Sequence, residues 1–189
     1  MAGPERPVPG RQVDAARVRP TVSVFGSNAV GSDGGAEALA EAVGRKLAEL
    51  GYAVANGGYG GTMEAGSRGA SQAGGHTIGV TCSVWRARPN AYISEVIQTS
   101  CLSERVGRLA EVASAGFVVL PGGTGTLLEL AWVWEGMAKK FLPRRPVVCV
   151  GDFWRALIDT IASIRGAHAD IVSIAAGPDD LERFFPRLG

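Results

Sequence analysis

Three glycine-rich turns are the segments of this sequence most suited to binding a ligand. They occupy residues 26–28, 57–61 and 122–126, and each follows a short apolar run that is typical of a strand. A glycine turn that leads into a helix offers free backbone N–H groups and the positive end of the helix dipole, which together suit a phosphate. The residues expected to bind such a ligand are Gly26, Ser27, Gly57, Gly58, Gly61, Gly122, Gly123, Thr124, Gly125 and Thr126.

The known phosphate-binding motifs do not fit these turns. A P-loop requires a lysine after its last glycine, whereas Gly31 is followed by Ser32. The dinucleotide pattern GxGxxG is absent after each predicted strand. The sequence therefore favours a mononucleotide or a sugar phosphate over NAD or magnesium-bound ATP. The alternative interpretation is that the glycines serve only tight turns.

Two charged residues could carry chemistry beside such a ligand. The predicted helix over residues 101–114 has an apolar stripe, and Arg105 lies at the edge of that stripe. A cation in this position needs an anionic partner or ligand. An arginine whose aliphatic stem packs on the core would give the same pattern. Glu129 is the only charge between Thr126 and Trp134 in a nearly apolar helix. Thr126 and Glu129 also fit a capping box, a role that leaves Glu129 within reach of a ligand.

Alternating strands and helices must position these residues. The expected strands cover residues 21–26, 52–55, 93–98, 117–120, 146–150 and 171–174, with one more that follows His76 and ends at Val80. The expected helices cover residues 35–50, 62–73, 101–114, 125–138, 153–165 and 178–187. This alternation predicts an α/β fold, a mainly parallel sheet with helices on both faces, in which ligands bind beyond the carboxyl ends of the strands.

Composition and charge exclude several classes of protein. The 189 residues are 46% hydrophobic and 20% charged, as in globular domains, and a net charge of +1 argues against a broad surface for nucleic acid. Three widely spaced cysteines and two separated histidines predict no metal site and no disulfide framework, which favours a reducing compartment such as the cytoplasm. No apolar run is long enough to cross a membrane. Residues 1–20, with four prolines, are expected to form a flexible tail, and residues 21–189 a single domain.

The glycine turns and the two charged residues together resemble the Lonely Guy (LOG) family, whose members are often mislabelled as lysine decarboxylases. Residues 121–129 fit the family's long and specific PGGxGTxxE signature. Residues 94–96 and 102–105 are similar to its GEV stretch and its MxxR segment, and residues 57–63 to its GGxxGLM turn. Residues 26–27 fall where the family has its first GS turn.

The resemblance, which covers about residues 21–175, implies a Rossmann-like three-layer sandwich and an enzymatic activity. Characterised members are cytokinin riboside 5′-monophosphate phosphoribohydrolases, which cleave the N-glycosidic bond of an N6-modified AMP to give free base and ribose 5-phosphate. They use no metal and no organic cofactor, and they are usually dimers with the site near the dimer interface. Arg105 and Glu129 match the family's catalytic arginine and glutamate, and residues 122–126 match its 5′-phosphate turn.

Several positions depart from the family's pattern. Val106 replaces the lysine of an RK pair, Glu64 stands where the family has glycine, and Glu135 replaces a common threonine. The loop before the GEV stretch, with Arg86 and Arg88, has no clear counterpart of a frequent acidic residue. These changes leave the nucleotide-phosphate chemistry in place, whereas the identity of the base stays open.

Three other functions compete with the phosphoribohydrolase. A non-catalytic carrier of a nucleotide or of the molybdenum cofactor would use the same turns, although the presence of both Arg105 and Glu129 favours an enzyme. A single-stranded DNA-binding protein is disfavoured by the near-neutral charge. A pyridoxal-phosphate decarboxylase is disfavoured because Lys46, Lys139 and Lys140 lie away from every glycine turn.

The expected partners are a small-molecule nucleoside monophosphate and a second copy of the chain. Trp132, Trp134 and Phe141 lie on or just after a nearly apolar helix, which favours a homodimer. The alternative is that these aromatic residues belong to the core. Neither a membrane nor a nucleic acid is expected as a partner.

Overall fold

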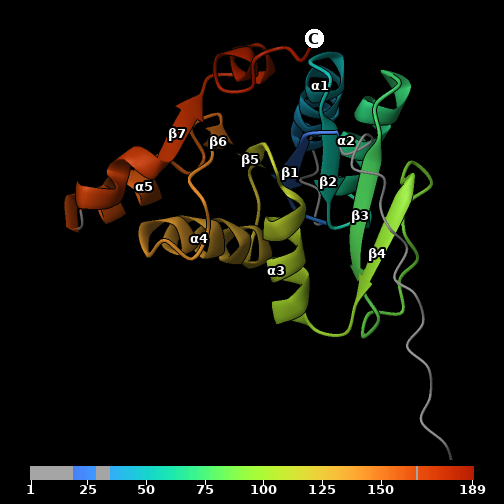
Figure 1. The fold of residues 1–189 in the computed structure, drawn as a ribbon, viewed down its shortest axis with the longest axis horizontal. Coiled ribbons are helices and arrows are strands. Elements are labelled where there is room, and N and C mark those ends of the chain that lie inside the picture. Colours follow the sequence, from blue (N-terminus) through green and yellow to red (C-terminus); the bar gives the residue numbers. More distant parts are fainter. Residues whose placement is uncertain (1–18, 29–34, 165) are drawn as a thin grey trace, which may run out of the picture.

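The computed structural model describes residues 19–28, 35–164 and 166–189, and these residues build a seven-stranded parallel sheet with helices around it (Figure 1). The expected flexible tail therefore lies almost wholly outside the described residues. The strands pair in the order β4-β3-β2-β1-β5-β6-β7, and each pairing is parallel. The strands are β1 Thr21–Phe25, β2 Ala53–Asn56, β3 Thr77–Cys82, β4 Glu95–Thr99, β5 Gly116–Val119, β6 Val147–Val150 and β7 Val172–Ala175.

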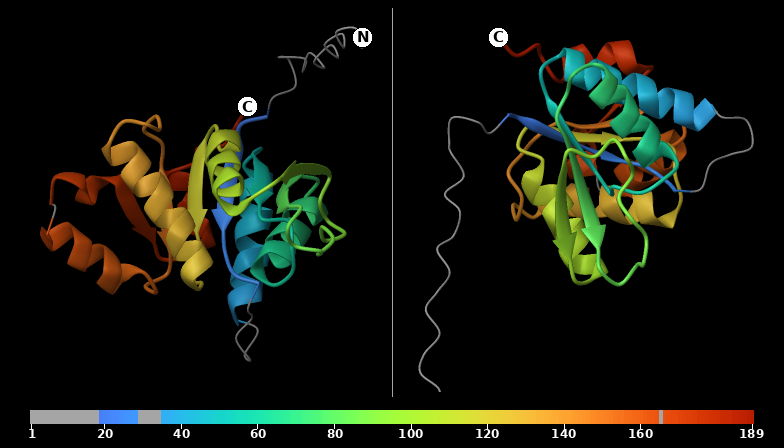
Figure 2. Two further views of the ribbon diagram at one scale, coloured as in Figure 1. Left: turned by 90° about the horizontal axis from the view of Figure 1, so that it is seen from below. Right: turned by 90° about the vertical axis from the view of Figure 1, so that its right-hand side faces the viewer.

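Helices cover both faces of the sheet. The first two, α1 and α2, pack on one face, and α3, α4 and α5 pack on the other, an arrangement that Figure 2 shows from two further directions. The helices are α1 Gly35–Glu49, α2 Thr62–Gln72, α3 Leu102–Val112, α4 Thr124–Ala138 and α5 Arg155–Ile164, with short 3₁₀ helices η2 Gly166–Ile171 and η3 Pro178–Arg183. The α/β sandwich with a parallel sheet that the sequence predicts is confirmed.

Strands β1, β5, β6 and β7 each contribute to two hydrophobic cores, because neighbouring side chains point to opposite faces of the sheet. In β1, Val22 and Val24 join the core beneath α1 and α2, whereas Phe25 joins the core beneath α3 and α4. In β5, Val118 belongs to the first core and Phe117 to the second. Burial on both faces explains why these strands are continuous apolar runs rather than alternating ones.

The C-terminal segment is the main departure from the predicted elements. The helix predicted over residues 178–187 is instead the short 3₁₀ helix η3, and η2 was not predicted. Pro178 and Pro186 bracket a segment too short for a stable α-helix, and the burial of Leu181 and Phe185 holds it against the core. Among the described residues, none of the helices has the length and apolar character needed to cross a membrane.

The three glycine turns follow three adjacent strands in the middle of the sheet. Strand β1 lies between β2 and β5, and the direction in which successive strands are added reverses between β1 and β5. A parallel sheet opens a crevice at such a reversal, beyond the carboxyl ends of its strands. The turns after β1, β2 and β5 therefore meet at one edge, which positions the candidate site.

Helices α1 and α2 cross at backbone contact distance because the residues at the crossing lack side chains. A Cβ at Gly44 would lie 2.0 Å from the carbonyl oxygen of Gly66, and one at Gly69 would lie 2.0 Å from that of Glu41. An ion pair between Arg68 of α2 and Glu41 of α1, with an N–O distance of 2.7 Å, joins the two helices beside this crossing. The position of α2, and with it the second glycine turn, depends on this contact.

The substitution Gly44→Ala tests the crossing. We expect it to lower the free energy of unfolding by about 1–3 kcal/mol, because the new methyl group forces the helices apart and outweighs the better helix propensity of alanine. The matched control is Gly107→Ala in α3, where a Cβ meets nothing within 4 Å. That variant should be as stable as the wild type or gain up to about 1 kcal/mol. Urea unfolding measures both, and equal stability of the two variants would contradict the close contact.

Candidate functional site

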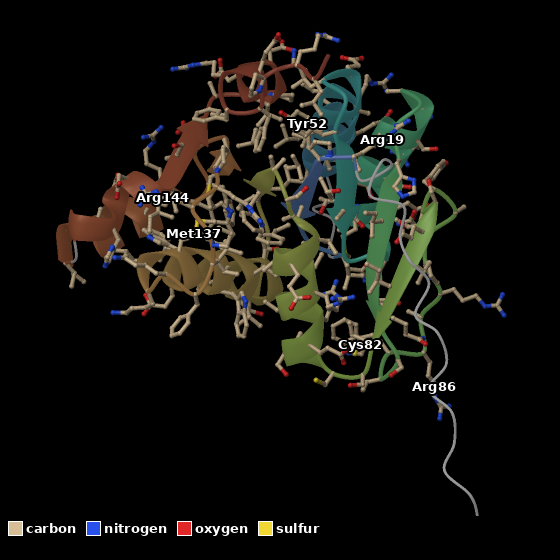
Figure 3. All side chains as sticks on the ribbon, in the orientation of Figure 1. Arg19, Tyr52, Cys82, Arg86, Met137 and Arg144 are labelled. Atoms are coloured by element: carbon tan, nitrogen blue, oxygen red, sulfur yellow. The ribbon has the colours of Figure 1, made fainter. Side chains whose placement is uncertain are left out.

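A cavity of about 600 Å³ opens at the carboxyl edge of the sheet, a volume typical of small-molecule sites. Its walls are the first glycine turn, the N-terminal end of α4 and the loop over residues 83–94. Arg105 from α3, Glu129 from α4 and part of the second glycine turn with the start of α2 complete the wall. Figure 3 shows Cys82 at the carboxyl end of β3 and Arg86 in the loop beyond it.

The structure brings most of the predicted site residues to this cavity. Those that line it are Gly26, Ser27, Arg105, Gly123, Thr124, Gly125, Thr126 and Glu129. Four predicted residues do not line it: Gly57, Gly58, Gly61 and Gly122. Two of these glycines, Gly57 and Gly122, leave room for side chains that line the cavity.

Gly57 makes room for the guanidinium of Arg105. A Cβ at Gly57 would lie 1.8 Å from Nη2 of Arg105, so that any side chain there would force the guanidinium to move. Gly122 makes room for Thr126 in the same way, because a Cβ at Gly122 would lie 2.2 Å from Thr126 Oγ1. Gly61 has a φ of 64°, a conformation that other residues rarely adopt, and turns the chain into α2.

Hydrogen bonds between Ser27 and Thr62 tie the first glycine turn to the second. The Ser27 N–H donates to Thr62 Oγ1 at 2.8 Å, while the Thr62 N–H and hydroxyl both donate to the Ser27 carbonyl at 3.0 Å. The first N–H group of α2 is therefore already used within the protein. Glu64 adds a negative charge to the first turn of the same helix. Both features make the N-terminus of α2 a poor site for an anion.

The N-terminus of α4 is open by contrast. Its N-cap residue, Gly123, receives no side-chain capping hydrogen bond. All residues of α4 are described, and none in its first turn is acidic. Thr126 Oγ1 is the one buried side-chain nitrogen or oxygen among the described residues that has no hydrogen-bond partner. Unpaired backbone donors and the helix dipole lie at the cavity, an arrangement that suits an anionic oxygen, and the Thr126 hydroxyl is buried next to them against Gly122.

The capping box that Thr126 and Glu129 fit as an alternative is not formed. Because α4 begins at Thr124, Thr126 lies inside the first turn and Glu129 lies one turn further along the helix. Thr126 makes no capping bond, and Glu129 pairs with Arg105 instead. The flexible glycines before Thr124 let the helix start earlier than the Thr-x-x-Glu pattern suggests.

A buried ion pair lies at the centre of the cavity wall. Arg105 Nη1 donates to Glu129 Oε1 at 3.3 Å, and each residue is 6% exposed. Arg105 Nε donates to the Val80 carbonyl at 2.9 Å, which fixes the plane of the guanidinium. Arg105 is therefore not an arginine whose charged end reaches solvent. Burial raises the pKa of Glu129 to about 7, against the opposing effect of the Arg105 charge, so its carboxyl group titrates near neutral pH.

Tyr59 and Trp85 line the cavity, and sequence reasoning missed both. The guanidinium carbon of Arg105 lies 5.8 Å from the ring centre of Tyr59 and 5.2 Å from that of Trp85. Tyr59 was detectable because it lies inside the second glycine turn, whereas Trp85 lies in a loop, where no periodicity marks it. The other lining residues that were not predicted are Asn28, Gly60, Met63, Ala87 and Arg88.

Comparisons with known proteins match both the sequence and the fold. The model of the SLOG cluster4 family matches residues 19–169. Relatives named cytokinin riboside 5′-monophosphate phosphoribohydrolase from Mycobacterium marinum and Mycobacterium tuberculosis are 38% and 37% identical to this chain over 99 residues. Each match covers 51% of this chain and 52% of the relative, so the chain spans about half the length of these curated relatives.

Solved structures share most of the fold at low sequence identity. A molybdenum cofactor binding protein from Rippkaea orientalis has a TM-score of 0.71 at 24% identity, over 87% of this chain and 94% of that chain. The molybdenum cofactor carrier protein of Chlamydomonas reinhardtii has a TM-score of 0.70 at 24% identity, over the same 87% and 94%. These likenesses show the fold alone. The family model and the phosphoribohydrolase relatives confirm the resemblance to LOG proteins, and the chain belongs to the SLOG cluster4 family.

Proposed function

We propose that this protein hydrolyses the N-glycosidic bond of an adenosine 5′-monophosphate, with or without an N6 substituent, to free base and ribose 5-phosphate. The observation that carries the proposal is the buried Arg105–Glu129 pair beside the open N-terminus of α4 in one cavity. Glu129 lies about one helical turn beyond the N-terminus of α4. In a nucleoside monophosphate the ribose separates the phosphate from the N-glycosidic bond, so a phosphate at this N-terminus would bring that bond towards Glu129. The names of the curated relatives support the same reaction.

The N-terminus of α4 is the proposed phosphate site. The N–H groups of Thr124 and Gly125 are donors for phosphate oxygens, and the helix dipole favours the negative charge. Arg88 lines the same cavity and adds a positive charge. Ser27, from the first glycine turn, borders the site.

Glu129 is the proposed catalytic carboxylate. As the base departs, positive charge develops on C1′ and the ring oxygen of the ribose, and an ionised carboxylate beside them stabilises it. Water then adds to C1′, and a proton of the water passes by way of Glu129 to the departing base nitrogen. The C1′–N bond is replaced by a C1′–O bond, and the reaction needs no redox partner. Arg105, held by the Val80 carbonyl, keeps the Glu129 carboxylate in place.

A non-catalytic carrier is the second candidate function. The structural neighbours named as carriers share the fold, so the fold does not separate a carrier from an enzyme. The Arg105–Glu129 pair favours the enzyme, because binding an anion gives no reason to bury a carboxylate beside it. Pyridoxal-phosphate chemistry has no support, since Lys46, Lys139 and Lys140 lie outside the cavity wall.

We also propose that the protein forms a homodimer through the outer side of α4. Trp132 is 43% exposed and Phe141 is 84% exposed, at the end of a nearly apolar helix. Trp134 is 6% exposed and packs in the core beneath α4, so the prediction that groups it with Trp132 and Phe141 is wrong for this residue. Contact with a second copy would remove the exposed indole and phenyl rings from water.

The reaction is tested by Glu129→Gln and Arg105→Ala. We expect the wild type to release free base and ribose 5-phosphate from AMP or N6-isopentenyl-AMP, and each variant to lose at least about a hundredfold in kcat. Both variants should stay folded, because glutamine still accepts the Arg105 N–H and a Glu129 without Arg105 takes up a proton. Chromatography measures the products, and circular dichroism checks folding. A folded wild type that binds AMP and releases no base would favour the carrier, and full activity in either variant would remove that residue from the mechanism.

The raised pKa of Glu129 predicts opposite pH dependences of activity and stability. Because the ionised carboxylate is the active form, kcat/KM should rise with pH through about 7 and fall to about 3% of its plateau at pH 5.5. The free energy of unfolding should fall as pH rises from 4.5 to about 7, since the folded pKa lies above the ordinary value. The substrate phosphate also titrates, near pH 6. Its effect on binding is measured separately in Glu129→Gln, and a rate that does not change between pH 5.5 and 8 would contradict the assignment.

The molar mass in solution tests the proposed dimer. Light scattering of the purified protein should give twice the chain mass of 19.6 kDa. Trp132→Glu should shift the mass towards that of one chain, because it places a charge in the apolar contact. A wild-type protein that has the mass of one chain at micromolar concentration would end the dimer proposal.

A further inference from the structure

We propose that Trp85 is the platform on which the base of the nucleotide rests. The inference rests on the proposed function and extends it, because it assigns the base end of the cavity to one side chain. Trp85 lies in the loop between β3 and β4, outside every motif that the sequence analysis identified. Its role is to bind the flat purine ring, not to take part in bond cleavage.

The contacts along the cavity wall follow the linear order of a nucleoside monophosphate. The open N-terminus of α4 provides the anion site, and Glu129 follows one turn later on the same helix. Glu129 is 3.3 Å from the guanidinium of Arg105, and that guanidinium lies 5.2 Å from the ring centre of Trp85. Phosphate donors, the reacting carboxylate and an aromatic ring thus follow one another as phosphate, ribose and base do in the ligand. A base attached to a ribose beside Glu129 therefore reaches the aromatic end of the cavity.

The exposure of Trp85 has no explanation in the packing of the free protein. Trp85 is 42% exposed, whereas Trp134 and Trp154, the two core tryptophans, are each 6% exposed. Those two indole N–H groups donate to backbone carbonyls, while the indole N–H of Trp85 has no acceptor within the described part of the chain. An apolar ring half-open to a ligand cavity gains contact area when a flat ligand covers it.

The ring of Trp85 is nevertheless held in a defined place. The Tyr59 hydroxyl accepts from the Cys82 N–H at 2.8 Å and donates to the Cys82 carbonyl at 3.2 Å, so the Tyr59 ring is fixed. Trp85 packs against it edge to face, with ring centres 5.7 Å apart. Asn90 ties the far end of the loop to the second glycine turn, by a 2.8 Å bond from its N–H to the Gly58 carbonyl. Hydrogen bonds fix the loop without burying the indole, and the part of the ring that Arg105 and Tyr59 do not cover stays open to a ligand.

Stacking of this kind recognises a flat aromatic base and tolerates substituents at its edge. Each base stacked on an aromatic side chain contributes about tenfold to a hundredfold in affinity. The proposal therefore predicts that Trp85 binds plain and N6-substituted adenine nucleotides alike. Ribose 5-phosphate, which has no base, should bind without any contribution from Trp85. This difference separates a base platform from a residue that only supports the fold.

The experiment measures binding to Glu129→Gln, which leaves the nucleotide intact. Titration calorimetry with AMP and with ribose 5-phosphate gives both affinities, and tryptophan fluorescence reports stacking. In the Glu129→Gln background, Trp85→Ala should weaken AMP binding about tenfold to a hundredfold and leave ribose 5-phosphate binding unchanged. Trp85→Phe should keep AMP affinity within about threefold and abolish the fluorescence change caused by AMP. Trp132→Phe is the matched control, because Trp132 is equally exposed at 43% and lies outside the cavity wall. AMP should still quench the tryptophan fluorescence of that variant.

The outcomes separate this proposal from the proposed reaction. Unchanged AMP affinity in Trp85→Ala, or equal losses for AMP and ribose 5-phosphate, would overturn the platform. A fluorescence change that persists in Trp85→Phe would overturn it as well, even if Trp85→Ala failed to fold. If AMP quenches the Trp85 fluorescence of a wild-type protein that releases no base, the platform is supported and the proposed hydrolysis is contradicted. Binding of neither ligand by the folded wild type would overturn both proposals.

Discussion

The burial of one guanidinium is the constraint on which the rest of the site depends. Arg105 carries five N–H donors on its guanidinium, so a position that is 6% exposed must supply it with acceptors. The Val80 carbonyl and the Glu129 carboxylate provide them from a strand and from a neighbouring helix. Space for the side chain exists because residue 57 is a glycine. The second glycine turn therefore serves the chemistry by its missing side chain, not by its N–H groups.

The same pair sets up an electrostatic balance within the cavity. Burial pushes Glu129 towards its neutral form and Arg105 pulls it towards the ionised form, which leaves its pKa at about 7. An anionic phosphate bound at the N-terminus of α4 would push this pKa further upward, and the charges of Arg105 and Arg88 oppose that effect. The Ser27–Thr62 hydrogen bonds use the first N–H group of α2, whereas the N-terminus of α4 has no side-chain cap. The proposed function would place a phosphate and this carboxylate in the same cavity.

This chain shares its fold with proteins named as molybdenum cofactor binding or carrier proteins, and part of its sequence with relatives named as phosphoribohydrolases. The parallel sheet and its central reversal create the crevice in either case, and the glycine turns shape it. What differs between such proteins must lie in the side chains that enter the crevice. In this chain those are the Arg105–Glu129 pair and the loop that carries Trp85 and Arg88. These side chains, and not the fold, carry the proposed function.

The amino-acid sequence alone determined the alternating strands and helices, the parallel sheet and the edge at which the glycine turns meet. It did so because the spacing of apolar residues follows which faces of the strands and helices are buried. It also marked Arg105, by its place on an apolar stripe, and Glu129, by its isolation. Only the tertiary structure decided that these two residues, 24 positions apart, pair with each other, since that depends on how α3 and α4 meet. It likewise moved Gly57 behind the cavity wall, placed Trp134 in the core and brought Trp85 to the cavity. Periodicity describes one element at a time, whereas the partners of a buried charge and the exposure of a loop residue are set by distant segments that pack together.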